Sequence, residues 1–416
     1  MRLIIATSAL ALAATGAAAQ TASDVAETYA GIAAAAYADA VEGAEGLKAA
    51  VDALVAEPSE ETLAAAREAW LASRPAYMQT EVFRFGNPIV DDWEGKVNAW
   101  PLDEGLIDYV DASYFGGAEN AFADLNVIAS PAFTLNGEDV DAAEITPALL
   151  EETLQEAGGN EANVATGYHA VEFLLWGQDL AADTDAAGDR PYTDFVTGAD
   201  CTGGNCDRRA AYLVTATDLL LSDLEWMAGQ WAEGGEARGE VLADPDPAVR
   251  ILTGMGSLAY GEMAGERIKL GLLLQDPEEE HDCFSDNTPA SHYGDIRGIA
   301  NVWYGSYTGP DGEITEGAGL QDLVTAADAD LAATFTAELE AALATADDLV
   351  ARAAGDSAYD MMLVKVDEDG NAVIAQLVED LVTMAGSIER MSAALDAEGV
   401  VMEGSDALDN EAAVFE

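Results

Sequence analysis

The chain is poor in positive charge, histidine and cysteine. Its 416 residues include 17 Lys and Arg against 78 Asp and Glu, which gives a formal net charge of -61. Such a charge repels phosphate backbones and anionic lipids, so nucleic acid and anionic membrane surfaces are poor partners. The field concentrates cations instead, although adaptation to salty water, in which an acidic surface preserves solubility, explains most of this charge.

Long apolar runs are missing after the first residues. No later run reaches the ~20 residues that a membrane helix needs, so we expect no transmembrane segment. Residues 1–19 start with Met1 and Arg2, continue with mostly apolar residues and end in three alanines. This is the pattern of a cleaved secretory signal peptide. No cysteine follows it, so we expect a periplasmic protein without a lipid anchor, with surface association as the alternative.

Cysteine occurs three times. Cys201 and Cys206 enclose a short Thr-Gly-Gly-Asn segment, and in an exported chain this spacing favours a local disulfide over a metal site. Cys283 is then left as a buried thiol or, as the less favoured alternative, a soft metal ligand beside His281.

Helix dominates the predicted secondary structure. Alanine is abundant, β-branched runs are short, and apolar residues recur at three- and four-residue intervals, which predicts an all-α protein. Helices are predicted at residues 23–42, 45–56, 59–80, 145–156, 161–177, 207–233, 246–274, 319–354 and 372–397.

Three long segments are predicted as loops, and long ordered loops are usually functional. They are residues 86–142, 181–206 and 276–318. The second loop divides the chain into two helical halves. We therefore expect two helical domains, at residues 20–195 and 196–400, and an acidic tail at 401–416.

One predicted helix carries a histidine three residues before a glutamate. His169 and Glu172 lie in the run Gly-Tyr-His-Ala-Val-Glu-Phe-Leu-Leu-Trp-Gly, and at 3.6 residues per turn they share a face. An imidazole and a carboxylate one turn apart can bind one cation or exchange one proton. The alternative is a buried histidine that is hydrogen-bonded to its helix neighbour.

A second helix carries a polar stripe at steps of four, three, four and three residues, which keeps its members within about 80° of one another. The stripe consists of Trp70, Arg74, Tyr77, Glu81 and Arg84. Two arginines beside one glutamate on a helix that must pack favour a buried polar network. The alternative is that the charged side chains turn outward past Pro75.

The Gly-x-His-x-x-Glu pattern followed by Leu-Leu-Trp-Gly resembles the signature of the imelysin family, bacterial periplasmic or surface proteins named after an insulin-cleaving peptidase. Residues 70–86, 97–104 and 281–288 resemble the iron-regulated branch of that family. The resemblance extends to about residue 305. It implies a fold of two related helical bundles and a role in iron uptake or the iron response.

A metal site needs four to six ligands, and His169 and Glu172 supply two. We expect Glu81 and Asp103 to complete the set, in an oxygen-rich site that favours iron over copper or zinc. The residues expected around the ligands, to balance charge or to hold an accompanying anion, are Arg74, Arg84, Tyr77 and Trp100. Asp282, Asp286 and Asn287 could also bind a cation, but such residues are ordinary loop formers, and that interpretation is favoured.

We therefore expect an exported protein that binds a metal ion or metal chelate, with membrane iron-transport components as partners. The alternative function is a metallopeptidase of the imelysin type. Zinc peptidases with a His-Glu-x-x-His motif place two histidines one helical turn apart, and the chain has no such pair. It also has no Gly-x-Ser-x-Gly motif, so binding is favoured over catalysis. A structural surface protein without a ligand is the least favoured class.

Overall fold

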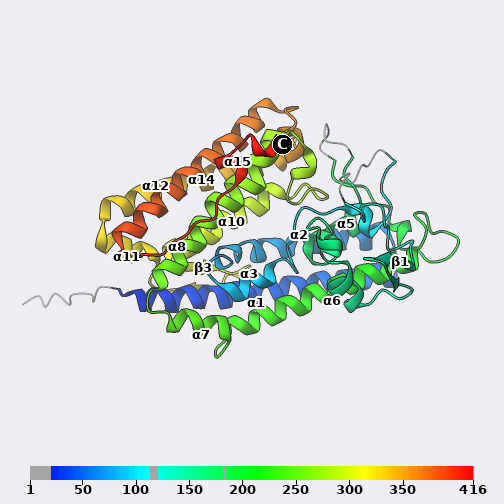
Figure 1. The fold of residues 1–416 in the computed structure, drawn as a ribbon, viewed down its shortest axis with the longest axis horizontal. Helices are drawn as coiled ribbons and strands as arrows, with labels where there is room; N and C mark the ends of the chain where they lie inside the picture. The colour runs from blue at the N-terminus through cyan, green and yellow to red at the C-terminus, as the bar shows by residue number, and fades with distance from the viewer. Residues whose placement is uncertain (1–19, 113–119, 181–183, 185, 356, 416) are drawn as a thin grey trace, which may run out of the picture.

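The computed structural model describes residues 20–112, 120–180, 184, 186–355 and 357–415. The expected signal peptide at 1–19 lies outside these residues. Most of the described chain is helical, and its long helices form two packed layers (Figure 1). The predicted all-α class with two packed bundles is confirmed.

The first layer is built around one long helix, α1 (Ala22–Ala56), which packs along both α2 (Glu60–Met78) and α6 (Cys206–Trp231). Thr21 and Ser59 begin α1 and α2 with capping boxes, in which each side chain bonds the backbone three residues on. The shorter helices on this side are α3 (Pro88–Glu94), α4 (Glu104–Ile107), α5 (Gly167–Trp176) and α7 (Glu236–Ala243).

The second layer is made by helices from the C-terminal part of the chain, and α12 and α14 run side by side along its outer edge (Figure 1). Its elements are α8 (Pro247–Ser257), a π-helix (Leu258–Lys269), α9 (Leu270–Leu274), α10 (Thr288–Tyr304), α11 (Leu320–Ala327), α12 (Ala329–Ala353), α13 (Tyr359–Leu363), α14 (Glu368–Ala394) and α15 (Asp406–Asp409).

Small elements complete the fold. Two antiparallel hairpins pair β1 (Ala132–Leu135) with β2 (Glu138–Asp141) and β3 (Ser306–Thr308) with β4 (Ile314–Glu316). Tyr307 lies opposite Thr315 in the second hairpin, which packs on α1. The remaining turns are 3-10 segments at Glu81–Phe83, Ala157–Gly159, Tyr192–Asp194, Pro277–Glu279 and Ala413–Phe415, and a π-turn at Leu149–Leu154.

Helix α10 joins the two layers, because it packs on α2 from one side and on α12 from the other. Two of its glycines make this approach possible. A Cβ atom on Gly294 would lie 2.7 Å from Met78 Cβ, and one on Gly298 would lie 2.7 Å from the Gln79 carbonyl oxygen. The end of α2 therefore touches the backbone of α10 where no side chain would fit.

Several predicted boundaries differ from the structure. The loop expected at 276–318 contains the 17-residue helix α10, whose glycines and buried polar side chains hide its periodicity. The two helices expected at 23–42 and 45–56 are one helix, and the helix expected at 319–354 is interrupted at Asp328, whose side chain caps α12. The helix expected at 161–177 begins only at Gly167.

The division at residues 195 and 196 stays a prediction. Helices α6 and α7 follow this point in the chain, yet both pack against α1 in the first layer. Among the helices of the described ranges, none combines the length and the apolar composition that crossing a membrane requires.

Candidate metal centre

The start of α5 is fixed by a glycine. Gly167 has a φ of +82°, and a Cβ atom there would lie 2.5 Å from the Val97 carbonyl oxygen. The same oxygen accepts a hydrogen bond from the Tyr168 amide at 2.8 Å. Only glycine permits this backbone conformation and this approach together, so it holds the first turn of α5 against the segment that follows α3.

His169 and Glu172 contact each other on the buried face of α5. Nδ1 of His169 lies 3.1 Å from Oε2 of Glu172, and both side chains are fully buried. The other carboxylate oxygen accepts hydrogen bonds from the amide of Ser285 at 3.0 Å and from its hydroxyl at 2.6 Å. Glu172 therefore links α5 to residues 280–287, which we call the 280–287 loop.

This loop brings a second histidine and an aspartate to His169. Oδ1 of Asp282 lies 3.4 Å from Nδ1 of His281 and 3.9 Å from Nδ1 of His169. The two imidazole rings are 4.7 Å apart, and Trp100 lies 5.1 Å from the His169 ring. Each of the three residues offers a ligand atom within 4.8 Å of the others, and all three are buried. Two imidazoles and one carboxylate thus converge on one place.

Asp282 is held by a dense set of donors. Nη2 of Arg74 lies 2.7 Å from Oδ1 of Asp282, while Nη1 of Arg74 donates to Oδ1 of Asn98 at 2.8 Å. Ser291 and Asn287 donate to Oδ2 of Asp282 at 2.5 and 2.7 Å. Burial alone would raise the pKa of Asp282, but the Arg74 charge outweighs it and holds that pKa well below the usual range. The carboxylate is therefore ionised.

Both histidines of the cluster are neutral. Burial and then the charge of Arg74 lower the pKa of His169 to about 3, and burial and then Arg267 lower that of His281 well below its usual value. Neutral imidazole is the form that binds metals. Nε2 of His169 is buried and has no hydrogen-bond partner among the described residues. This unused ring nitrogen is the atom that a bound metal ion would satisfy.

The contacts of Glu172 favour a positioning role. A metal-binding histidine usually donates its second ring N–H to a carboxylate, which fixes the tautomer and turns the other nitrogen to the metal. Glu172 stands in that relation to Nδ1 of His169 and has its other oxygen on Ser285. Burial and the nearby Asp282 charge raise the pKa of Glu172 well above its ordinary value, while the hydrogen bonds from Ser285 and the charge of Arg74 act in the opposite direction and favour the carboxylate.

The structure brings only part of the polar stripe to this cluster. Arg74 reaches Asp282, whereas Glu81 binds Arg267, with 2.6 Å between Oε2 and Nη2. Arg84 pairs with Glu94 at 3.3 Å and with Glu262 at 3.5 Å. Glu81 and Arg84 thus belong to a separate network around Arg267. Arg74 and Glu81 are only 1% and 2% exposed, so the stripe is buried rather than solvated.

The remaining expected residues lie in different surroundings. Trp100 contacts the two histidine rings, and the Tyr77 ring lies 5.8 Å from the Arg74 guanidinium. Asp103 accepts a hydrogen bond from Asn120 and is not a member of the His169 cluster. The expected ligand set of His169, Glu172, Glu81 and Asp103 is therefore not assembled at one place.

Sequence reasoning did not assign His281 as a ligand, and for Asp282 it favoured ordinary loop formation over cation binding. His281 and Asp282 were placed in a loop whose position relative to His169 only folding decides. The usable signal was that their segment resembles the same family as the His169 motif. Cys201 and Cys206 form a disulfide with Cα atoms 6.0 Å apart, and Cys283 is a buried free thiol.

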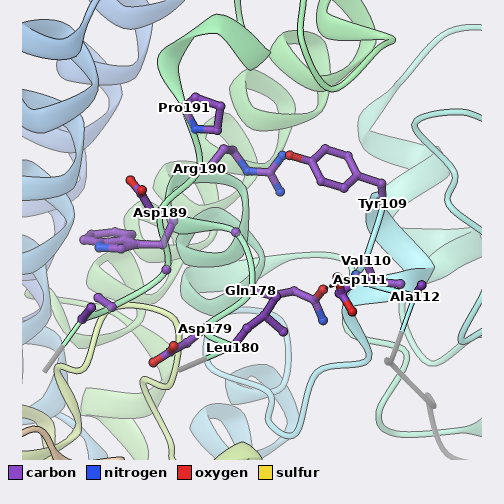
Figure 2. Close-up of a pocket in the computed structure, with 15 residues that line it drawn as sticks. Tyr109, Val110, Asp111, Ala112, Gln178, Asp179, Leu180, Asp189, Arg190 and Pro191 are labelled. Atoms are coloured by element: carbon purple, nitrogen blue, oxygen red, sulfur yellow. Dashed lines mark hydrogen bonds between the residues drawn. The ribbon is translucent and has the colours of Figure 1, made fainter. Parts of the chain in front are cut away.

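A cavity of about 520 Å³ opens beyond the C-terminal end of α5, but it contains none of the clustered side chains. Figure 2 shows the Arg190 guanidinium facing the Tyr109 ring in this cavity, at 5.1 Å from the ring centre. Nη1 of Arg190 is already paired with Asp108 at 2.8 Å and with Asp194 at 3.1 Å. The arginine is compensated, so the cavity offers no free positive charge.

Known proteins give a consistent family assignment. The family model described as Imelysin matches residues 33–388. A structure of a putative iron-regulated protein A precursor from Parabacteroides distasonis superposes with a TM-score of 0.63 at 15% identity, covering 92% of this chain and 97% of that one. An imelysin-like protein from Psychrobacter arcticum gives 0.57 at 17% identity, with 91% and 98% covered.

A short stretch is also similar to a curated protein. It is 37% identical over 65 residues to iron-regulated protein A of Synechococcus elongatus, and it spans 15% of this chain and 18% of that relative. The two structural likenesses establish the shared fold, and the family model covers most of the sequence. The chain belongs to the imelysin family.

Proposed function

We propose that this protein is an exported iron-binding protein whose metal ligands are His169, His281 and Asp282. The observation that carries the proposal is the convergence of three buried ligand atoms within 4.8 Å. Two neutral imidazoles and one carboxylate are a donor set that suits ferrous iron, and such an ion would take its further ligands from water or a chelating anion. This set has less oxygen than the one expected from the sequence, and its two imidazoles favour ferrous iron.

The surrounding residues have defined roles in this proposal. Arg74 balances the charge of Asp282 and fixes its orientation through the 2.7 Å ion pair. Glu172 contacts Nδ1 of His169 and would fix the orientation of the ring, which leaves Nε2 without a partner in the described part of the chain and available to an ion. Trp100 packs against the two imidazole rings and limits how they can turn.

The same donor set also matches the three protein ligands of zinc hydrolases, which keeps the metallopeptidase as a second candidate. Burial favours binding over proteolysis. His169, His281 and Asp282 are 0%, 2% and 0% exposed, so a polypeptide substrate has no surface on which to meet them. A peptidase needs its scissile bond beside the metal. We therefore expect no metal-dependent cleavage of protein substrates.

Export and iron uptake complete the proposal. A disulfide such as Cys201–Cys206 forms and persists in an oxidising compartment such as the periplasm. The composition of residues 1–19 agrees with that location. Membrane iron-transport components are the partners that an exported iron carrier would serve.

The test is anaerobic titration of metal-free protein with ferrous iron, followed by X-ray absorption spectroscopy of the bound ion. His169→Gln and His281→Gln should each abolish high-affinity binding. His292→Gln is the matched control, because His292 is equally buried but lies outside the cluster. If His292→Gln weakens binding as much as the other two variants, or if wild-type protein shows no imidazole ligands, the assignment is wrong.

A further inference from the structure

A second cavity, of about 180 Å³, lies against the 280–287 loop. The loop contributes Glu280 and Cys283, which directly flank the His281-Asp282 pair in sequence. The other lining residues come from the segment after α5, the turn before the loop and α13, and they are Asp179, Leu180, Pro277, Glu278 and Asp360. Asp179 and Leu180 also line the larger cavity, where Figure 2 shows both side chains.

Three carboxylates meet beside this cavity from segments that are far apart in sequence. Asp179, Asp286 and Asp360 each offer an oxygen within 4.8 Å of the others, and Asp360 is buried. Two oxygens that bind one calcium ion at 2.3–2.6 Å are separated by at most about 5 Å. The three oxygens therefore have the spacing of ligands around a common ion.

A fourth carboxylate gives the independent indication of a ligand. Glu280 is 0% exposed and lines the cavity, yet neither of its carboxylate oxygens has a hydrogen-bond partner among the described residues. Burial, and then the charges of Asp286 and Asp360, raise the pKa of Glu280 well above its usual value. The nearby Thr288 hydroxyl, which accepts the amide of Asp282, opposes that rise in pKa only in part. A fully buried carboxylate without a donor is unfavourable unless it is neutralised or coordinates a metal. Glu280 thus has two acceptor atoms available for a cation.

We propose that Asp179, Glu280, Asp286 and Asp360 bind a hard divalent cation of the calcium type. Such ions take six to eight oxygen ligands, and four carboxylates that bind through one or two oxygens each, with water, supply that number. Cys283 does not compete, because burial raises the pKa of its thiol well above the usual value and hard ions disfavour sulfur. This site is chemically distinct from the histidine cluster and does not rest on the proposed iron site.

The cation also has a structural consequence for the loop. Glu280 and Asp286 lie at the two ends of the segment that carries His281, Asp282 and Ser285. An ion bound by both ends of the segment and by Asp360 of α13 would hold the segment in place. Its contacts would add to those that Asp282 makes with Arg74 and Ser285 makes with Glu172. The site therefore stabilises the loop that presents the histidine cluster.

The test uses the whole mature protein, stripped with a calcium chelator and titrated calorimetrically with calcium. The buffer contains about 0.5 M KCl, where the Debye length falls to roughly 4 Å and diffuse binding to the acidic surface is screened. We expect one saturable site and a higher melting temperature with calcium. Glu280→Gln and Asp360→Asn should each weaken binding at least about tenfold, because affinity follows the number of charged ligands.

Two controls keep the result specific. Glu225→Gln removes one carboxylate from the exposed face of α6 and should bind calcium like wild type. His169→Gln removes one ligand of the histidine cluster and should also bind calcium like wild type. Circular dichroism checks that each variant is folded. If Glu280→Gln is not, Asp286→Asn is the variant that tests the proposal, because Asp286 is only half-buried. Absence of saturable binding in wild type, or equal binding by folded site variants, overturns the proposal.

Discussion

Arg74 of α2 and Asp282 of the 280–287 loop form an ion pair across 208 positions of the chain, with both side chains at most 1% exposed. The pair connects the first layer directly to the loop that carries His281. Because neither charge reaches water, each depends on the other for compensation. The Arg74 side chain therefore contributes both to the fold and to the state of the candidate metal centre.

Loss of Arg74 should be costly for stability. Arg74→Met leaves the charge of Asp282 buried without its partner, and breaking such a pair typically costs about 3–5 kcal/mol. Arg390→Met is the control, since Arg390 is 59% exposed and should change the free energy of unfolding by no more than about 0.5 kcal/mol. Urea unfolding of both variants measures the difference. Equal stabilities would show that the buried pair is not required.

Glu172→Gln should separate a positioning residue from a ligand. An amide can still accept a hydrogen bond but orients His169 less strongly, so we expect ferrous affinity to fall about 10–100-fold without being abolished. X-ray absorption should show the same two imidazole ligands as in wild type. Complete loss of binding in a folded Glu172→Gln protein would instead make Glu172 a direct ligand.

His292 should make stability depend on pH. Burial lowers its pKa from 6.5 to about 3. Below pH 6.5 this histidine is therefore protonated in the unfolded chain but stays neutral in the folded chain. The stability present above pH 6.5 is therefore lost progressively as the pH falls toward 3. Between pH 6.5 and 5, wild type should lose up to about 2 kcal/mol relative to His292→Gln. Chemical unfolding across this range measures the gap, and parallel pH curves would refute the expectation.

Gly167 should resist substitution, because its backbone has a φ of +82° and a Cβ atom would overlap the Val97 carbonyl. We expect Gly167→Ala to destabilise the protein by more than about 2 kcal/mol. Gly46 in α1 has no neighbouring atom within 4 Å of a built Cβ, so Gly46→Ala should stabilise by about 0.5–1 kcal/mol. Thermal melting compares the two. A gain in stability for both would mean that the α5 start tolerates a side chain.

Local periodicity predicts well where one helix contains the whole pattern. The contact between His169 and Glu172 follows from their spacing within α5. The prediction that all five residues share one helix face is wrong beyond Tyr77. Helix α2 ends at Met78, and the 3-10 turn at Glu81–Phe83 changes the angle per residue. Glu81 and Arg84 therefore point to a different network from Arg74.

Long-range partners could not be found in the same way. Ser285 contacts Glu172 across 113 positions, and no spacing rule relates residues that far apart. Helix α10 was missed because its glycines and buried polar residues, such as Asp295 and Asn301, break the apolar period that marks a helix. These glycines and polar residues make contacts with other helices, so their positions can be explained only from the folded structure.

The close passage of α10 over the end of α2 limits how an ion can reach His169. A Cβ atom on Gly298 would lie 2.7 Å from the Gln79 carbonyl oxygen. The backbone of α10 is therefore in direct contact with the backbone at the end of α2. Opening the two layers like a hinge would break this contact along with the Arg74–Asp282 pair. For the proposed metal site, loading and release are therefore expected to proceed through local displacement of Trp100, while the layers and the Arg74–Asp282 pair stay in place.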